Sequence, residues 1–111
     1  MRIRLWVLSF FLIIMSVQVS AKDASTIDHV ILGTATKGGG FQLFGQNLIE
    51  VINATEPTLR VTELPTKGSK QNIPFLEQGK IQLGLVEGNA ARQALDGVGR
   101  APANLQVLSV M

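Results

Sequence analysis

HVILGTATKGGGF, residues 29–41, indicates a buried strand that passes through a glycine-rich loop into a helix. The run that ends at Leu32 lacks the alternation of a surface strand, which favours a parallel strand covered on both faces. Gly33 ends the strand, and residues 34–40 form the loop. Beyond the loop, apolar residues at three- and four-residue spacing predict an amphipathic helix that stops at Asn53, ahead of Pro57. The apolar stripe comprises Phe41, Phe44, Leu48, Val51 and Ile52.

A second strand and a short second helix are predicted next. Residues 59–64 contain β-branched and alternating polar side chains and read as a strand, and residues 65–70 form a polar loop. Proline is tolerated in the first turn of a helix but not in its interior. Because of Pro74, we therefore expect the second helix to begin near Asn72 rather than at Ser69, and to be closed by Gly79.

The remaining chain continues the alternation of strands and helices. Residues 81–86 predict a third strand, and residues 89–95 predict a third helix that is capped by Asn89 and closed by Gly97. Residues 105–110 predict a fourth strand that runs to Met111. The resulting order, βαβαβαβ, predicts an α/β fold with a parallel sheet and right-handed crossovers.

The N-terminus has the layout of a secretory signal peptide. Arg2 and Arg4 precede an almost wholly apolar run over residues 5–17, and small residues lead to Ala21. The alternative is an uncleaved membrane anchor, but an anchor needs about 20 apolar residues and this run is shorter. We expect a cleaved signal over residues 1–21, export to the periplasm, and a mature domain over residues 22–111.

Composition excludes several classes of function. The chain holds 10 Lys and Arg against 8 Asp and Glu, and removal of Arg2 and Arg4 with the signal balances the charges. A balanced chain without a basic run argues against a nucleic-acid partner. With no Cys and one His, thiol catalysis, Cys-zinc sites and His-based triads are disfavoured. These absences argue against an enzyme, and we predict no cofactor and no metal.

The glycine-rich loop does not fit a nucleotide-binding motif. Gly33 and Gly38 have the spacing of a P-loop, but glycines follow where Lys and Ser or Thr belong. A loop that opens a helix nevertheless presents free backbone N–H groups at the positive end of the helix dipole, which suits an anion. The alternative is a tight turn without a ligand. The predicted ligand-binding residues in this segment are Thr34, Thr36, Gly39, Gly40 and Phe41.

Two further loops are expected at the same edge of the sheet. Ser69 follows the second strand, and Glu87 and Asn89 follow the third. Because ligands bind at the carboxyl ends of parallel strands, we predict that these three residues also contact the ligand. Ser69 and Asn89 have an alternative role as helix N-caps. Glu87 is either solvated at the end of its strand or directed at a ligand amine.

Four segments together resemble the TAXI family of solute-binding proteins of tripartite ATP-independent periplasmic (TRAP) transporters. The resemblance spans about residues 30–111 and is most specific in the middle block, with Gly-Ser-x-x-Asn at residues 68–72 and Gly-Leu-Val at residues 84–86. The other matching parts are the glycine-rich loop from residue 31 to residue 40 and the tail at residues 107–111. Where the family usually has Thr-Tyr-Tyr, this chain has Phe41-Gln42-Leu43, and Glu87-Gly88-Asn89 replaces Gln-Ser-Asp.

This resemblance implies one lobe of a type II periplasmic-binding-protein-like fold. Family members resemble a two-lobed clamp that closes on a small carboxylate solute, often an amino acid or dicarboxylate, and delivers it to an ion-driven membrane permease. Residues 22–111 are then expected to form a partial N-terminal lobe, with the second lobe absent from this chain. The alternative function is the substrate-binding component of an ABC importer, which shares this fold.

Overall fold

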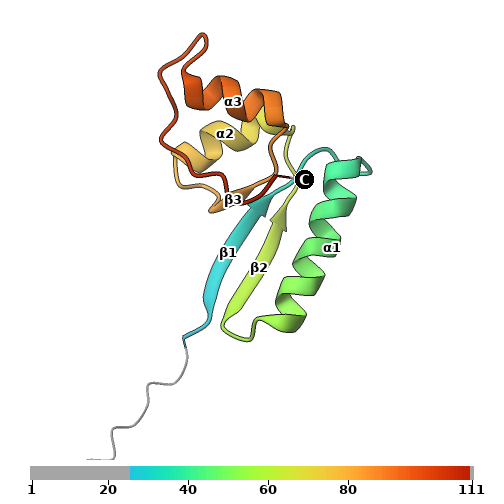
Figure 1. The fold of residues 1–111 in the computed structure, drawn as a ribbon. Helices are drawn as coiled ribbons and strands as arrows, with labels where there is room; N and C mark the ends of the chain where they lie inside the picture. Colours follow the sequence, from blue (N-terminus) through green and yellow to red (C-terminus); the bar gives the residue numbers. More distant parts are fainter. Residues whose placement is uncertain (1–25, 111) are drawn as a thin grey trace, which may run out of the picture.

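The computed structural model describes residues 26–110 and shows three parallel strands that alternate with three helices (Figure 1). The α/β class predicted from the sequence is confirmed. The predicted signal peptide lies outside the described residues. The elements are β1 (Asp28–Gly33), α1 (Gly40–Thr55), β2 (Leu59–Leu64), α2 (Ser69–Glu77), β3 (Leu83–Gly84) and α3 (Gly88–Asp96).

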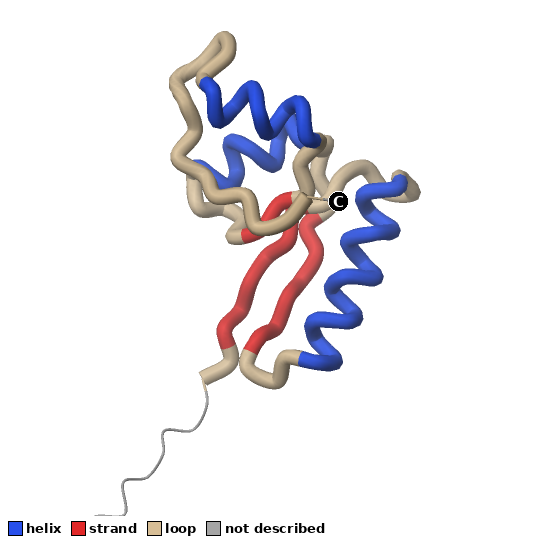
Figure 2. Tube along the Cα trace, in the orientation of Figure 1, coloured by secondary structure: helices blue, strands red, loops and turns tan. Residues whose placement is uncertain are grey.

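β1 is the central strand of the sheet, whose order is β2-β1-β3. Val30 pairs with Val61 on one side, and Leu32 pairs with Leu83 on the other, both in parallel register. Because each helix follows a parallel strand, all three helices begin at the carboxyl edge of the sheet. Figure 2 shows α1 beside the β1–β2 pair, while α2 and α3 lie together near β3.

The two faces of β1 are covered by different helices. Leu32 and Val61 are buried with Leu85, and Phe41, Leu48 and Ile52 pack against them from α1. On the opposite face, a Cβ at Gly33 would lie 2.6 Å from Ile81 Cδ1 and 2.7 Å from Asn72 Oδ1. Gly33 therefore allows α2 and the chain before β3 to approach the sheet closely.

The predicted apolar stripe of α1 is only partly buried. Phe44 is 40% exposed and Val51 is 59% exposed, so these two residues do not join the core. The helix also continues to Thr55, two residues past the predicted stop. Asn53 lies within the helix and holds β2 instead: its Nδ2 donates to Val61 O at 2.9 Å, and its Oδ1 accepts from Val61 N at 2.8 Å.

The predicted start of α2 was wrong, because the helix begins at Ser69 and includes Pro74 in its interior. Pro74 has no N–H to bond to the carbonyl of Lys70, which costs one helical hydrogen bond. The first turn is nevertheless anchored, since the N–H groups of Gln71 and Asn72 donate to Gly68 O at 3.0 and 2.9 Å. The helix thus starts at Ser69 although Pro74 lies in its interior.

The third strand is shorter than predicted, and the fourth does not form. β3 comprises two residues instead of six, and the sheet hydrogen bonds extend one residue further on each side, from Gln82 N to Ile31 O and from Leu85 N to Gly33 O. The N–H of Ile31 donates to the side-chain Oε1 of Gln82 at 2.9 Å, so a side chain replaces the next backbone acceptor. Residues 105–110 have no strand, and Leu108 is 72% exposed.

An open, mainly apolar groove of about 780 Å³ is lined in part by residues 105–109, which belong to the predicted fourth strand. It is lined by α1, by β3, by α3 and by residues 105–109. Its apolar lining residues include Phe44, Leu48, Leu83, Leu95, Leu105, Val107 and Leu108. In the part of the chain from residue 26 to residue 110, no helix has the length and apolar character needed to cross a bilayer.

Candidate functional site

Three loops meet at the carboxyl edge of the sheet, one after each strand. The N–H of Thr66, in the loop after β2, donates to Ala35 O in the loop after β1 at 3.2 Å. The N–H of Glu87, after β3, donates to Ser69 Oγ at the start of α2 at 2.8 Å. Each loop is therefore bonded to a neighbouring one, and all three helices begin at this edge of the sheet (Figure 1).

A single buried side chain connects the three loops. Asn72 on α2 is fully buried, and its Nδ2 donates to Thr34 O and to Leu85 O, both at 2.8 Å, and lies 3.2 Å from Gly33 O. Its Oδ1 accepts from Thr66 Oγ1 at 2.7 Å. The sequence analysis included Asn72 in the Gly-Ser-x-x-Asn pattern but did not select it as a site residue. The pattern itself was the signal that could have identified it.

The start of α1 is open to a ligand. Gly39 is its N-cap and offers no side-chain hydrogen bond. The N–H of Gly39 donates to Thr36 O at 3.0 Å, whereas those of Gly40 and Phe41 have no partner within residues 26–110. Two adjacent free N–H groups at the positive end of a 16-residue helix form an anion-binding arrangement. The predicted role of Gly40 and Phe41 rests on these backbone groups, since the Phe41 ring packs against the core.

The start of α2 is open in the same way. Its N-cap is Gly68, with φ 91°, a conformation that suits glycine and provides no side-chain cap. Across the described residues, the N–H groups of Ser69 and Lys70 have no hydrogen-bond partner. The Ser69 hydroxyl accepts from Glu87 N instead of capping its own helix. Ser69 therefore joins α2 to the loop before α3, and its backbone N–H is free.

The start of α3 differs, because the protein supplies its own anion. The Glu87 carboxylate accepts from Asn89 N at 3.1 Å and from Ala90 N at 3.2 Å, so Glu87 is the N-cap. The predicted capping by Asn89 was wrong, since Asn89 is the second residue of the helix, two positions after the N-cap, and its side chain is exposed. The Glu87 carboxylate at the N-cap position satisfies two N–H groups of the first turn and places a negative charge at the positive end of the helix dipole.

The two predicted threonines occupy different environments. Thr34 is fully buried, and its hydroxyl donates to Glu63 Oε1 at 2.9 Å on β2. Thr36 is exposed in the glycine-rich loop. The structure thus brings Thr36, Gly39 and Gly40 to the surface of the loop and holds Thr34 beneath it. No cluster of three or more His, Asp or Glu side chains suited to a metal occurs in the described part of the chain.

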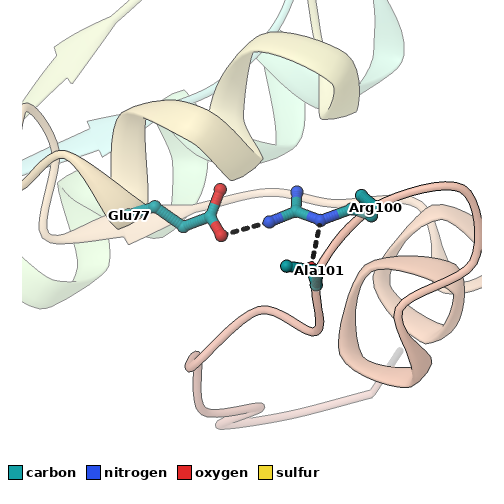
Figure 3. A network of polar contacts seen from close by, with 3 residues as sticks. All are labelled: Glu77, Arg100 and Ala101. Atoms are coloured by element: carbon teal, nitrogen blue, oxygen red, sulfur yellow. Dashed lines mark hydrogen bonds and ion pairs between the residues drawn. The ribbon is translucent and has the colours of Figure 1, made fainter.

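A smaller hollow of about 240 Å³ lies between α2 and α3 and includes Lys70, Gln93 and Arg100 in its lining. Figure 3 shows that Arg100 is already engaged: its Nη2 pairs with the Glu77 carboxylate, and its Nε donates to Ala101 O at 2.9 Å. This pairing fastens the loop after α3 to the end of α2. Neither this hollow nor the apolar groove includes the open start of α1.

The parallel sheet, the helices that begin at one edge and the loops joined there define a lobe of the periplasmic-binding-protein type. A family model described as the NMT1-like family matches residues 32–110. The chain belongs to the NMT1-like family, a family related to solute-binding proteins and typically non-enzymatic. Searches of curated proteins and of solved structures returned no match.

Proposed function

We propose that this protein is an extracytoplasmic receptor of the TAXI type, which captures a small carboxylate solute for a TRAP transporter. Membership in a solute-binding family supports a small-solute ligand. The Gly-Ser-x-x-Asn and Gly-Leu-Val segments support the TAXI assignment. The charge and hydropathy pattern of residues 1–21 supports a cleaved signal and a periplasmic location.

The observation that carries this proposal is the pair of open helix starts at one edge of the sheet. Gly40 and Phe41 on α1, and Ser69 on α2, offer backbone N–H groups without partners in the described chain. A carboxylate accepts such bonds, and they are charge-assisted. The side chains of Thr36, in the loop before α1, and Asn89, in the first turn of α3, are exposed and supply further polar contacts.

The remaining predicted residues have supporting roles in this proposal. Thr34 lies below the glycine-rich loop and fixes it to β2 through Glu63. Glu87 places a negative charge at the start of α3, which disfavours a second carboxylate there and favours a solute amine. An amino acid therefore matches the charges of the site better than a dicarboxylate does.

Calorimetric titration of the full chain tests the solute class. We expect an amino acid to bind and its carboxamide analogue to bind about tenfold or more weakly, because a hydrogen bond to a charged group contributes about 1.5–3 kcal/mol. Equal binding of the acid and the amide would overturn the carboxylate site.

Two variants locate the site. A Cβ at Gly39 would lie 3.1 Å from Thr36 O, so Gly39→Val crowds the open start of α1 and should weaken binding more than Ser69→Ala does. Unchanged affinity in both folded variants would place the site elsewhere.

Transport driven by an ion gradient, rather than by ATP, with the cognate permease distinguishes a TRAP receptor from an ABC receptor.

A further inference from the structure

We infer that Asn72 is the positioning residue of the site: its side chain sets the placement of the three loops that would contact a solute. This inference rests on the proposed function for its effect on affinity. Its effect on the loops is independent of any ligand. Asn72 contacts no predicted solute position itself, since it is fully buried below the loops.

The hydrogen bonds of Asn72 reach three separate segments. Thr34 O belongs to the segment after β1, Thr66 Oγ1 to the loop after β2, and Leu85 O to the loop after β3. Across residues 26–110, no other side chain is bonded to all three. Thr66 in turn accepts from Gly68 N at 3.1 Å, which extends the network to the N-cap of α2.

The surroundings of Asn72 are shaped to admit an amide. A Cβ at Gly33 would lie 2.7 Å from Asn72 Oδ1, and a Cβ at Gly84 would lie 3.4 Å from Asn72 Cβ. Glycines on β1 and β3 thus leave the space that the side chain fills. An amide both donates to the carbonyls of Thr34 and Leu85 and accepts from the Thr66 hydroxyl. An aspartate here would place its negative charge against the carbonyl oxygens, which repel it. A leucine would leave both carbonyls and the Thr66 hydroxyl proton without this hydrogen-bond partner.

Asn53 provides a matched control, because it is also an asparagine whose amide bonds to backbone groups of the sheet. Its two bonds go to the N–H and carbonyl of Val61, in the middle of β2 and away from the three loops. Asn53→Ala and Asn72→Ala both remove buried or partly buried amide hydrogen bonds. The two variants differ in whether those bonds hold the loops.

The test compares hydrogen exchange and solute affinity of the full chain in four variants. In Asn72→Ala and in the milder Thr66→Val, we expect the backbone amides at position 66 and at Glu87 to exchange about tenfold or more faster, and amino-acid affinity to fall about tenfold or more. Thr66→Ser keeps the hydroxyl and should restore both properties. Asn53→Ala should lower thermal stability while leaving exchange at these loop amides and affinity within about twofold.

The outcomes separate this inference from the proposed function. If Asn72→Ala does not fold, the exchange of the loop amides in Thr66→Val decides whether Asn72 has the positioning role. If Thr66→Val alters loop exchange no more than Asn53→Ala does, the positioning role is refuted. If loop exchange changes as expected but the parent chain binds no amino acid, the positioning role is supported and the proposed solute class fails.

Discussion

Gly45 lies on the buried side of α1, where close packing against the sheet, rather than a special backbone conformation, requires a glycine. A Cβ at this position would lie 2.4 Å from Thr34 Cγ2. Thr34 cannot turn away without breaking its hydrogen bond to Glu63. The contact therefore couples the packing of α1 on the sheet to the base of the glycine-rich loop.

Gly45→Ala should lower the free energy of unfolding by about 1–3 kcal/mol, because overpacking forces side chains or backbone to shift. Denaturant unfolding monitored by circular dichroism measures the change. Gly88→Ala is the control, since a Cβ there meets nothing within 4 Å and φ is not positive. A Gly45→Ala protein as stable as the Gly88→Ala protein would contradict the tight packing of α1.

The cap of α3 gives a second prediction at this scale. Glu87→Ala should destabilise the protein by about 0.5–2 kcal/mol, because two N–H groups lose their acceptor. Asn89→Ala should change stability by less than about 0.5 kcal/mol, because its side chain is exposed and makes no cap bond. Thermal unfolding of both variants checks the order. A larger loss for Asn89→Ala would restore Asn89 as the cap.

At the level of elements, local patterns predicted the strand–helix alternation but not every boundary. The continuous apolar run before Gly33 and the β-branched residues of β2 located these strands, and glycines marked the ends of α2 and α3. The start of α2 was wrong because proline propensity is local, whereas Gly68 and the bonds of Asn72 set the start. The length of β3 was wrong because an apolar run does not show which backbone groups find a partner.

The interior proline of α2 provides a prediction for this element. Pro74→Ala should stabilise the protein by about 1–3 kcal/mol, because it restores an N–H able to bond to the carbonyl of Lys70 and removes a steric conflict within the helix. Guanidinium unfolding of the parent and of the variant measures the effect. Lys70→Ala on the same helix serves as an exposed control and should be nearly neutral. A loss of stability in Pro74→Ala would show that ring packing outweighs helix geometry.

At the level of the whole molecule, the candidate site was predicted as a set of loops but not as a hydrogen-bond network. The predicted alternation of strands and helices implies a parallel sheet, and in a parallel sheet the residues that follow β1, β2 and β3 lie at one edge. The inward hydroxyl of Thr34, the capping role of Glu87 and the central place of Asn72 depend on side-chain directions in three dimensions. The Gly-Ser-x-x-Asn pattern marked Asn72, but it did not give the direction of the Asn72 side chain, nor those of Thr34 and Glu87.

The open apolar groove gives a prediction for the molecule as a whole. Its lining includes Val107 and Leu108, which are 52% and 72% exposed. We expect the full chain to bind an apolar fluorescent dye and to associate as its concentration rises, because exposed contiguous apolar surface favours contact. Leu108→Lys should reduce both effects, as measured by fluorescence and sedimentation velocity, whereas Arg92→Ala on exposed α3 should not. A monomer that binds no dye would contradict this view.

The side chain of Gln82 has a consequence for how the sheet meets other chains. Unpaired N–H groups along a strand edge act as a template on which a foreign strand can grow, the first step toward fibrils. On β1, next to the residue that precedes β3, the N–H of Ile31 would be such a group, but the side-chain oxygen of Gln82 already accepts its hydrogen bond. A strand from another chain must first displace the Gln82 side-chain amide to bond to this N–H. The Gln82 side chain thus removes one open N–H group from this side of β1, which disfavours templated misassembly at this position.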